Sequence, residues 1–230
     1  MSAPLKDTRC LGLIGGLGPA ATVYYYRALI AAIERQSRAP RLLIAHADIN
    51  RVYQYVNGKD YDGLARYLAG LIAQMEAGGA EFTAIVAATP HICAPQLSRR
   101  STLPLIDMMT EVDKALRARQ LTRVALLGTR FTIETRMFGR LGDIEVVMPK
   151  PDEIDRIHTI YLQVVGGNGT AEHVAELRKL AKTFVTRDGA QAVLVAGTDL
   201  SPLLKADDGD VLLIDCADIH IDAIAQRMVG

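Results

Sequence analysis

Two short polar motifs follow apolar runs of similar sequence, and their residue types suit acid–base chemistry. Thr89 and His91 follow the run FTAIVAA, whereas Thr198 and Asp199 follow AVLVAG. An imidazole and a carboxylate can exchange protons with a substrate, and a threonine hydroxyl beside a backbone amide can bind a carboxylate oxygen. We therefore predict that His91 and Asp199 are catalytic and that Thr89 and Thr198 bind substrate. Helix capping or local hydrogen bonding is the alternative for each of these residues.

A glycine-rich loop, Gly15-Gly16-Leu17-Gly18-Pro19, supplies a second type of binding group. It follows an apolar run and precedes a helical pattern, so its backbone amides can face an anion at a helix amino terminus. We predict that Gly16, Leu17 and Gly18 bind the substrate, and we add Asp48 to this set; a tight turn without a ligand is the alternative. The GxGxxG pattern of dinucleotide-binding loops is absent, and Asp48 lies too far along the chain to be its acidic partner.

The composition argues against several classes of partner. The 230 residues include 26 basic and 26 acidic side chains, so no basic excess points to a nucleic acid. No apolar run approaches the roughly 18 residues of a membrane span, and the amino terminus MSAPLKDTRC has no apolar signal-peptide core. We expect a soluble cytoplasmic protein that binds neither nucleic acid nor membrane.

The cysteines indicate neither a disulfide framework nor a metal site. The chain has three of them, Cys10, Cys93 and Cys216, with no CxxC spacing and no even count. We expect reduced thiols, and we predict no metal-binding residues.

These polar motifs must be positioned by the apolar runs and helical patterns that alternate along the chain. Strands are predicted near 10–15, 41–47, 81–87, 103–106, 123–127, 143–147, 191–196 and 211–214. Helices are predicted near 20–36, 60–77, 91–99, 110–119, 131–140, 152–166, 171–187 and 217–228. Strands that alternate with helices indicate parallel sheets covered on both faces.

The two halves of the chain have similar sequences. The segment GAEFTAIVAATPH from Gly79 matches GAQAVLVAGTDLS from Gly189, 110 positions later. The segment LGLIGGLGPAAT from Leu11 matches VALLGTRFTIET from Val124, 113 positions later. Two matches at nearly equal offsets indicate a duplication.

The duplication and the alternating elements together define a predicted fold. The fold class is α/β, with two pseudo-symmetric doubly wound lobes that each contain a mainly parallel sheet flanked by helices. We predict an N-terminal lobe over 1–110 and a C-terminal lobe over 111–214. The final helix, 215–230, is expected to pack back on the first lobe.

Five segments together resemble the aspartate/glutamate racemase superfamily, close to its broad-specificity amino-acid racemase branch. They are GGLGPAAT, ATPH, TRVALLGTRFTIE, GTDLSPLL and IDCADIHIDAI, and they cover nearly the whole chain in order. The resemblance implies two α/β lobes with a site in the cleft between them, no cofactor, and a homodimer. It also implies a thiol from each lobe at the substrate α-carbon, one to remove a proton and one to return it on the opposite face.

The chain departs from this family at both thiol positions. The family pattern Cys-Asn-Thr-x-His is here Ala87-Ala88-Thr89-Pro90-His91, and Gly-Cys-Thr-Glu is here Ala196-Gly197-Thr198-Asp199. Ala87 and Gly197 carry no titratable group, so two-thiol racemisation is excluded. Cys93 and Cys216 are the remaining candidate thiols, and a buried structural role is the alternative for both.

The leading hypothesis is a cofactor-independent, isomerase-like enzyme that acts on a small amino-acid-like carboxylate with non-thiol acid–base groups. One alternative is a lyase or hydrolase for a related small acid. Another is a carboxylate-binding protein that has lost catalysis. The retained Thr89, His91 and Thr198 fit the last alternative as well as they fit a new activity.

Overall fold

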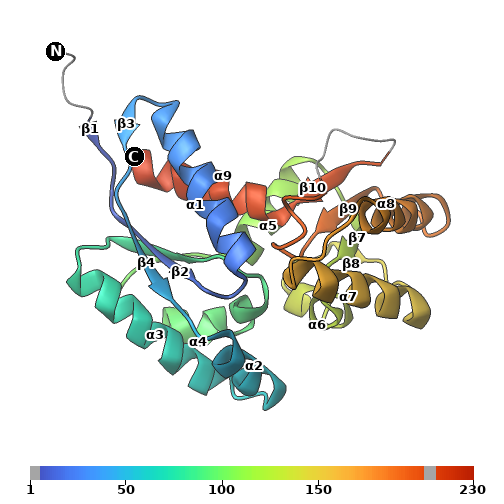
Figure 1. The fold of residues 1–230 in the computed structure, drawn as a ribbon, viewed down its shortest axis with the longest axis horizontal. Helices are drawn as coiled ribbons and strands as arrows, with labels where there is room; N and C mark the ends of the chain where they lie inside the picture. Colours follow the sequence, from blue (N-terminus) through green and yellow to red (C-terminus); the bar gives the residue numbers. More distant parts are fainter. Residues whose placement is uncertain (1–5, 205–210) are drawn as a thin grey trace. The chain divides into compact units, whose positions relative to one another are not determined.

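The computed structural model describes residues 6–204 and 211–230, shown in Figure 1; the first residues of the predicted N-terminal lobe lie outside this range. The chain forms two compact units. The first unit comprises the residues up to Asp107 together with His220–Gly230, and the second comprises Met108–Ile219.

The first unit is built on a four-stranded parallel sheet. Its strand order is β4 (Leu42–His46), β2 (Leu11–Gly15), β5 (Phe82–Ile85) and β6 (Leu105–Ile106). The central strands β2 and β5 are buried along their whole length, as their continuous apolar runs predict. Two short strands, β1 (Lys6–Asp7) and β3 (Arg38–Ala39), form a separate parallel pair.

Helices cover both faces of this sheet. In Figure 1, α1 (Pro19–Glu34) and the end of α9 (Cys216–Val229) lie on one face, and α3 (Tyr61–Ala77) and α4 (Ala94–Ser98) lie on the other. A helix that covers a sheet buries a stripe of apolar side chains spaced three and four residues apart, and α3 does so with Leu64, Leu68, Ile72 and Met75.

The second unit has a four-stranded parallel sheet of its own. Its strand order is β10 (Leu213–Asp215), β9 (Ala192–Val195), β7 (Arg123–Leu127) and β8 (Glu145–Val146). Its remaining helices are α5 (Met108–Ala118), α6 (Arg130–Glu134), the short 3-10 helix η2 (Met137–Gly139), α7 (Pro151–Val165) and α8 (Ala171–Thr186). The α/β class with parallel sheets and flanking helices is therefore confirmed.

The two sheets share one topology and one register. In chain order, the four strands of each sheet are arranged second, first, third and fourth. Leu11 pairs with Phe82 in the first sheet, and Val124 pairs with Ala192 in the second. These pairs join the strands that the sequence matches between the two halves, so the internal similarity extends to strand pairing.

Three local predictions were wrong. The helix α2 (Ile49–Asn57) was not predicted, because it is only nine residues long and buries only Val52 and Val56, so its apolar stripe is short. The helix predicted over 131–140 is broken, since Arg136, Met137 and Phe138 have φ values of 51°, 50° and 64°. The helix predicted over 91–99 begins instead as the 3-10 helix η1 (Thr89–Cys93) and continues as α4.

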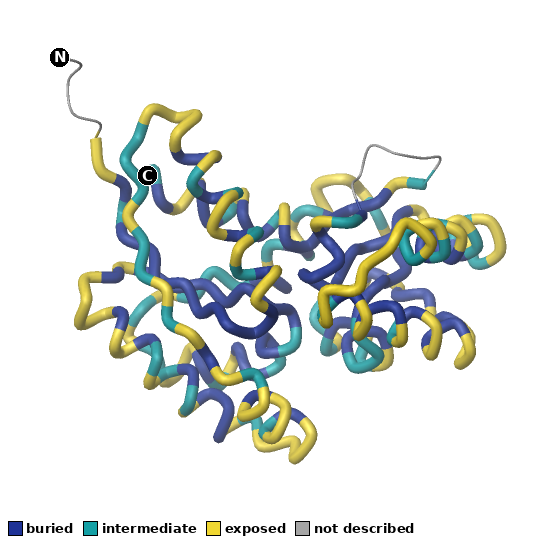
Figure 2. Tube along the Cα trace, in the orientation of Figure 1, coloured by how far each residue is buried: buried dark blue, intermediate teal, exposed yellow. Residues whose placement is uncertain are grey.

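Burial follows the layered arrangement of each unit. Figure 2 shows buried backbone along the sheets and alternating buried and exposed positions along the helices. The edge strand β4 differs, because its residues are half-buried or exposed. Within residues 6–204 and 211–230, no helix is both long enough and apolar enough to cross a membrane.

Candidate active site

The candidate residues cluster at the carboxyl ends of equivalent strands. In an open parallel sheet, ligands bind beyond these ends, where the chain connections diverge to opposite sides. That point lies between β2 and β5 in the first unit and between β7 and β9 in the second. Gly16–Gly18 follow β2, Ala87–His91 follow β5, and Gly197–Asp199 follow β9.

The glycine loop after β2 needs its glycines for backbone geometry. Gly16 has φ 82°, and a side chain there would place its Cβ 2.6 Å from the carbonyl oxygen of Ala47. The Gly16 amide donates to Thr22 Oγ1 at 3.0 Å, and the Thr22 hydroxyl donates to the Gly18 carbonyl at 3.1 Å. Because the Gly16 amide already has an acceptor, the anion-binding hypothesis rests on the amides of Leu17 and Gly18.

Asp48 has a local structural role. It caps α2, accepting hydrogen bonds from the amides of Asn50 at 2.9 Å and Arg51 at 3.5 Å. Its own amide donates to the hydroxyl of Tyr67 at 2.7 Å. Its role in substrate binding stays a prediction.

His91 is fully buried in the 3-10 helix that follows β5, whereas Thr89 at the start of that helix is half-buried. His91 Nδ1 lies 3.4 Å from Oδ1 of Asp107, and its Nε2 lies 3.4 Å from the carbonyl oxygen of Ile85. A carbonyl can only accept, so Nε2 is the protonated nitrogen in that contact. Asp107 was not predicted as a site residue, and it gives the imidazole a carboxylate neighbour.

A second buried histidine lies next to His91. The rings of His91 and His220 are 5.7 Å apart in an edge-on arrangement. His220 Nε2 donates to the carbonyl of Ile106 at 2.9 Å, which leaves Nδ1 to accept from the hydroxyl of Tyr25 at 3.1 Å. Burial, reinforced by the neighbouring His91, lowers the pKa of His220 to about 3. His220 is therefore a neutral residue of the folded core.

In the second unit, the end of β9 holds a buried hydroxyl–carboxylate pair. Thr198 and Asp199 are each 3% exposed. The hydroxyl of Tyr161, on α7, donates to Oδ2 of Asp199 at 2.9 Å. Tyr161 was not predicted as a site residue, because no pattern in the sequence connects it with a carboxylate 38 positions later.

A second buried carboxylate, Asp215, is the last residue of the neighbouring strand β10. Oδ1 of Asp215 accepts from the Ser201 hydroxyl at 2.9 Å and from the Ala217 amide at 2.8 Å. Burial, with the charge of Asp218 as the next cause, raises the pKa of Asp215 to about 6. The amide contact lies in the first turn of α9, so Asp215 has at least a structural role there.

The thiols lie in surroundings that disfavour a nucleophile. Cys10, Cys93 and Cys216 are free and buried. Burial raises the pKa of Cys93 to about 12, and it raises the pKa values of Cys10 and Cys216 as well. A thiol must lose its proton to attack, so these values weaken the hypothesis that Cys93 or Cys216 is a nucleophile. Within the described ranges, no cluster of three or more metal-ligating side chains occurs.

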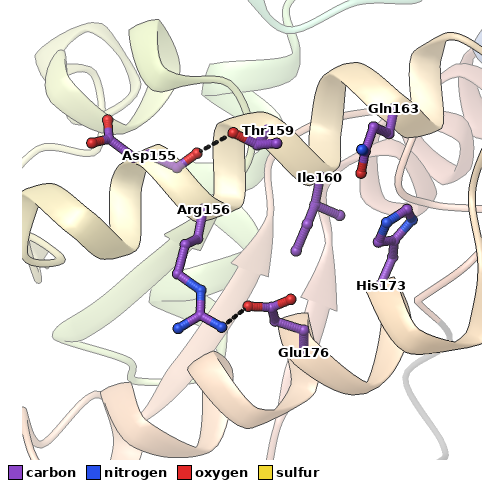
Figure 3. Close-up of a pocket in the computed structure, with 7 residues that line it drawn as sticks. All are labelled: Asp155, Arg156, Thr159, Ile160, Gln163, His173 and Glu176. Carbon is purple, nitrogen blue, oxygen red and sulfur yellow. Dashed lines mark hydrogen bonds and ion pairs between the residues drawn. The ribbon is translucent and has the colours of Figure 1, made fainter.

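A surface pocket of about 400 Å³ lies between α7 and α8 (Figure 3), and none of its lining residues is a predicted site residue. Its charged side chains are already paired, since Arg156 contacts Glu176 directly. The Thr159 hydroxyl donates to the Asp155 carbonyl of its own helix. The pocket is lined by Asp155, Arg156, Thr159, Ile160, Gln163, His173 and Glu176.

Comparison with known proteins identifies the family. The family model described as Asp/Glu/hydantoin racemase matches residues 14–224. The chain belongs to this family. The match spans both units, including every predicted site residue.

Solved structures support the same assignment. A candidate Asp/Glu racemase from Yersinia pestis is 25% identical, with a TM-score of 0.83 over 95% of this chain and 98% of the other. An aspartate racemase homologue from Pyrococcus horikoshii is 26% identical, with a TM-score of 0.81 over 95% and 98%. The aspartate racemase of Picrophilus torridus shares the fold at 19% identity, with a TM-score of 0.77 over 96% of each chain.

Proposed function

We propose that this racemase-family protein is a cofactor-independent, isomerase-like enzyme that acts on a small amino-acid-like carboxylate without a catalytic thiol. His91 and Asp199 are the proposed acid–base groups. Thr89, Thr198 and the amides of Leu17 and Gly18 are the proposed carboxylate ligands, with Gly16 and Asp48 shaping that part of the site. We place the reaction in the cytoplasm.

One observation carries this proposal: both strand ends with empty thiol positions keep buried polar groups. His91 is fully buried beside Asp107, and Asp199 is 3% exposed beside the Tyr161 hydroxyl. Burying polar groups costs free energy even when they are paired, and replacing them with apolar residues is often neutral. Their presence at equivalent strand ends therefore favours retained chemistry over simple packing.

The proposed chemistry is proton transfer at the carbon next to the carboxylate. A bound carboxylate fixes that carbon, so a general base of suitable geometry can remove its proton and a general acid can return one. Imidazole and carboxylate groups are weaker bases than a thiolate. They therefore favour substrates whose carbon-bound proton is more acidic than that of an ordinary amino acid.

The test is proton exchange in D₂O. The wild-type protein is incubated with both enantiomers of amino acids and 2-hydroxy acids, and loss of the α-proton signal is followed by NMR. We expect exchange for at least one compound, with loss of optical rotation on the same time scale. Binding of small carboxylates without exchange would overturn catalysis and favour the retired binding protein. A new product without exchange would favour the lyase or hydrolase.

We also propose a homodimer. Four large apolar side chains of the first unit are exposed, Val23 and Tyr26 on α1, Ile44 on β4 and Tyr53 on α2, and a second copy would cover them. Light scattering after size-exclusion chromatography should give twice the 25.0 kDa chain mass. The variant Val23→Glu should shift the mass towards the monomer; a wild-type monomer at high concentration would overturn the proposal.

A further inference from the structure

The space beside Gly197 is occupied by the ring of Tyr161. A Cβ built on Gly197 would lie 2.5 Å from Cε2 and 3.0 Å from Cδ2 of that ring. It would also lie 3.3 Å from Cα of Gly128, at the end of the neighbouring strand β7. No real Cβ tolerates the first contact, so position 197 accepts a side chain only if the tyrosine moves.

The position of Tyr161 follows from the packing of α7. The helix buries Ile154, Ile157, Ile160, Tyr161 and Val164, a stripe with the spacing of one helical face. Tyr161 lies in this stripe opposite Gly197 and is 8% exposed. Its ring is therefore fixed by the core of the second unit, where it contacts the position of the missing thiol.

The hydroxyl of Tyr161 is oriented as firmly as its ring. It donates to Oδ2 of Asp199 at 2.9 Å, and Asp199 lies two residues after Gly197. A carboxylate that accepts from a phenol orients it and can take its proton. A phenol and a thiol are both weak acids, with ordinary side-chain pKa values of about 10 and about 8.5, so either can return a proton to carbon.

We propose that Tyr161, oriented by Asp199, replaces the thiol of the second unit as the acid–base group that contacts the substrate carbon. This assignment rests on the proposed function and refines the role of Asp199, which acts through the tyrosine. It explains why position 197 is a glycine: the phenol and a side chain at 197 exclude each other.

The transfer balances without a further reactant. The substrate C–H bond breaks with its electron pair left on carbon, and the proton goes to the Tyr161 oxygen. The proton that this oxygen carried goes to Oδ2 of Asp199, so the carboxylate becomes a neutral acid as the substrate gains one negative charge. The reverse transfer returns a proton to carbon and restores the starting state.

The test compares Tyr161→Phe with Tyr25→Phe. Both substitutions remove a buried hydroxyl that makes a hydrogen bond, but Tyr25 belongs to the first unit, where its partner is His220. Exchange in D₂O is measured separately for the two enantiomers of a compound that the wild-type protein exchanges. Thermal unfolding and NMR titration with the carboxylate show whether each variant folds and binds.

An acid–base group on one face of the α-carbon exchanges the α-proton of only one enantiomer. We expect Tyr161→Phe to slow exchange of one enantiomer by about 100-fold or more and to change that of the other by less than about threefold. Tyr25→Phe should change both by less than about threefold.

Two results would overturn the assignment while leaving the proposed function intact. In the first, Tyr161→Phe exchanges the α-protons of both enantiomers at the wild-type rate. In the second, Tyr161→Phe slows the exchange of both enantiomers equally, which would indicate a structural role. A wild-type protein that exchanges no compound would instead overturn the proposed function, and this assignment with it.

Discussion

The ends of β5 and β9 occupy the same place in two sheets of the same topology, yet the positions that the family resemblance would assign to thiols differ between them. After β5, Ala87 keeps a Cβ, and the nearby polar groups are His91 and Asp107. After β9, Gly197 keeps none, and the ring of Tyr161 fills the space.

Under the proposed mechanism, the absence of a thiol at these positions does not imply the absence of catalysis. In the second unit the Tyr161 ring requires a glycine at position 197, because the ring and a side chain at 197 would occupy the same space. In the first unit the alanine has a Cβ, and the titratable groups near the strand end are the imidazole of His91 and the carboxylate of Asp107. The two units therefore call for separate tests.

The largest expected effect concerns the thiols that each unit still contains. Cys93, in the first unit, has a pKa of about 12, and Cys216, in the second, has a raised pKa, in both cases through burial. At neutral pH the thiolate fraction of Cys93 is about 10³-fold below that of an ordinary thiol, so iodoacetamide should label the native protein very slowly. Mass spectrometry with and without denaturant measures this. One thiol that reacts rapidly in the native protein would restore the nucleophile hypothesis.

Single substitutions of the polar groups test the contribution of each unit to proton exchange separately. His91→Asn and Asp199→Asn should each slow α-proton exchange by about 100-fold, the usual scale for loss of an acid–base group. Asp62→Asn is the control, since that carboxylate is exposed and forms a surface ion pair with Arg100. If only one of the two variants lost activity, a single unit would supply the chemistry.

Acid should affect the two units in opposite directions. The pKa of His220 is lowered to about 3. Below pH 6.5 the unfolded state therefore binds a proton at His220 that the folded state does not bind, and the first unit loses stability as the pH falls. Asp215 has its pKa raised to about 6, so between pH 6 and 3.8 the folded state binds the proton first, and the second unit gains stability. Each effect is about 1.4 kcal/mol per pH unit within its window.

Hydrogen exchange at pH 7 and pH 5, corrected for intrinsic rates, measures this contrast. Amides around His220 should lose protection relative to amides around Asp215. His220→Gln should remove the loss in the first unit and leave the second unchanged. Equal changes in both units would contradict the assigned protonation states.

A stability effect of similar size tests the packing of Gly197. Gly197→Ala should lower the free energy of unfolding by about 1–3 kcal/mol, because its Cβ overlaps the Tyr161 ring. Gly70→Ala is the matched control, since a Cβ there meets nothing within 4 Å, and an exposed helical alanine should stabilise the protein by about 0.5–1 kcal/mol. In a Tyr161→Ala background the cost at 197 should disappear. Urea unfolding of the wild type and the four variants measures these costs; an unchanged cost at 197 in the Tyr161→Ala background would contradict the packing.

The sheets could be predicted from sequence because buried parallel strands are continuous apolar runs with polar residues at their ends. Thr89, His91, Thr198 and Asp199 were proposed as site residues for the same reason, because they follow such runs. Helix α2 was missed because it is short and buries only Val52 and Val56. The break at Arg136–Phe138 depends on backbone angles that residue types do not reveal.

Tyr161 could not be predicted in the same way. Its relation to Asp199 and Gly197 arises when α7 packs against the sheet, and the decisive feature is a side chain that position 197 lacks. The contact of His91 with Asp107 likewise depends on the order of β5 and β6 in the folded sheet. Long-range packing therefore defines the candidate site more than local sequence does.

The most direct test of catalysis without thiols is a cysteine-free protein. The chain has three cysteines, so Cys10→Ala, Cys93→Ala and Cys216→Ala together remove every thiol. Exchange in D₂O is compared with the wild type after circular dichroism has shown that the variant folds. The proposed mechanism predicts exchange within about threefold of the wild-type rate. Loss of exchange in the folded variant would show that a thiol carries the reaction and would contradict the mechanism proposed for both units.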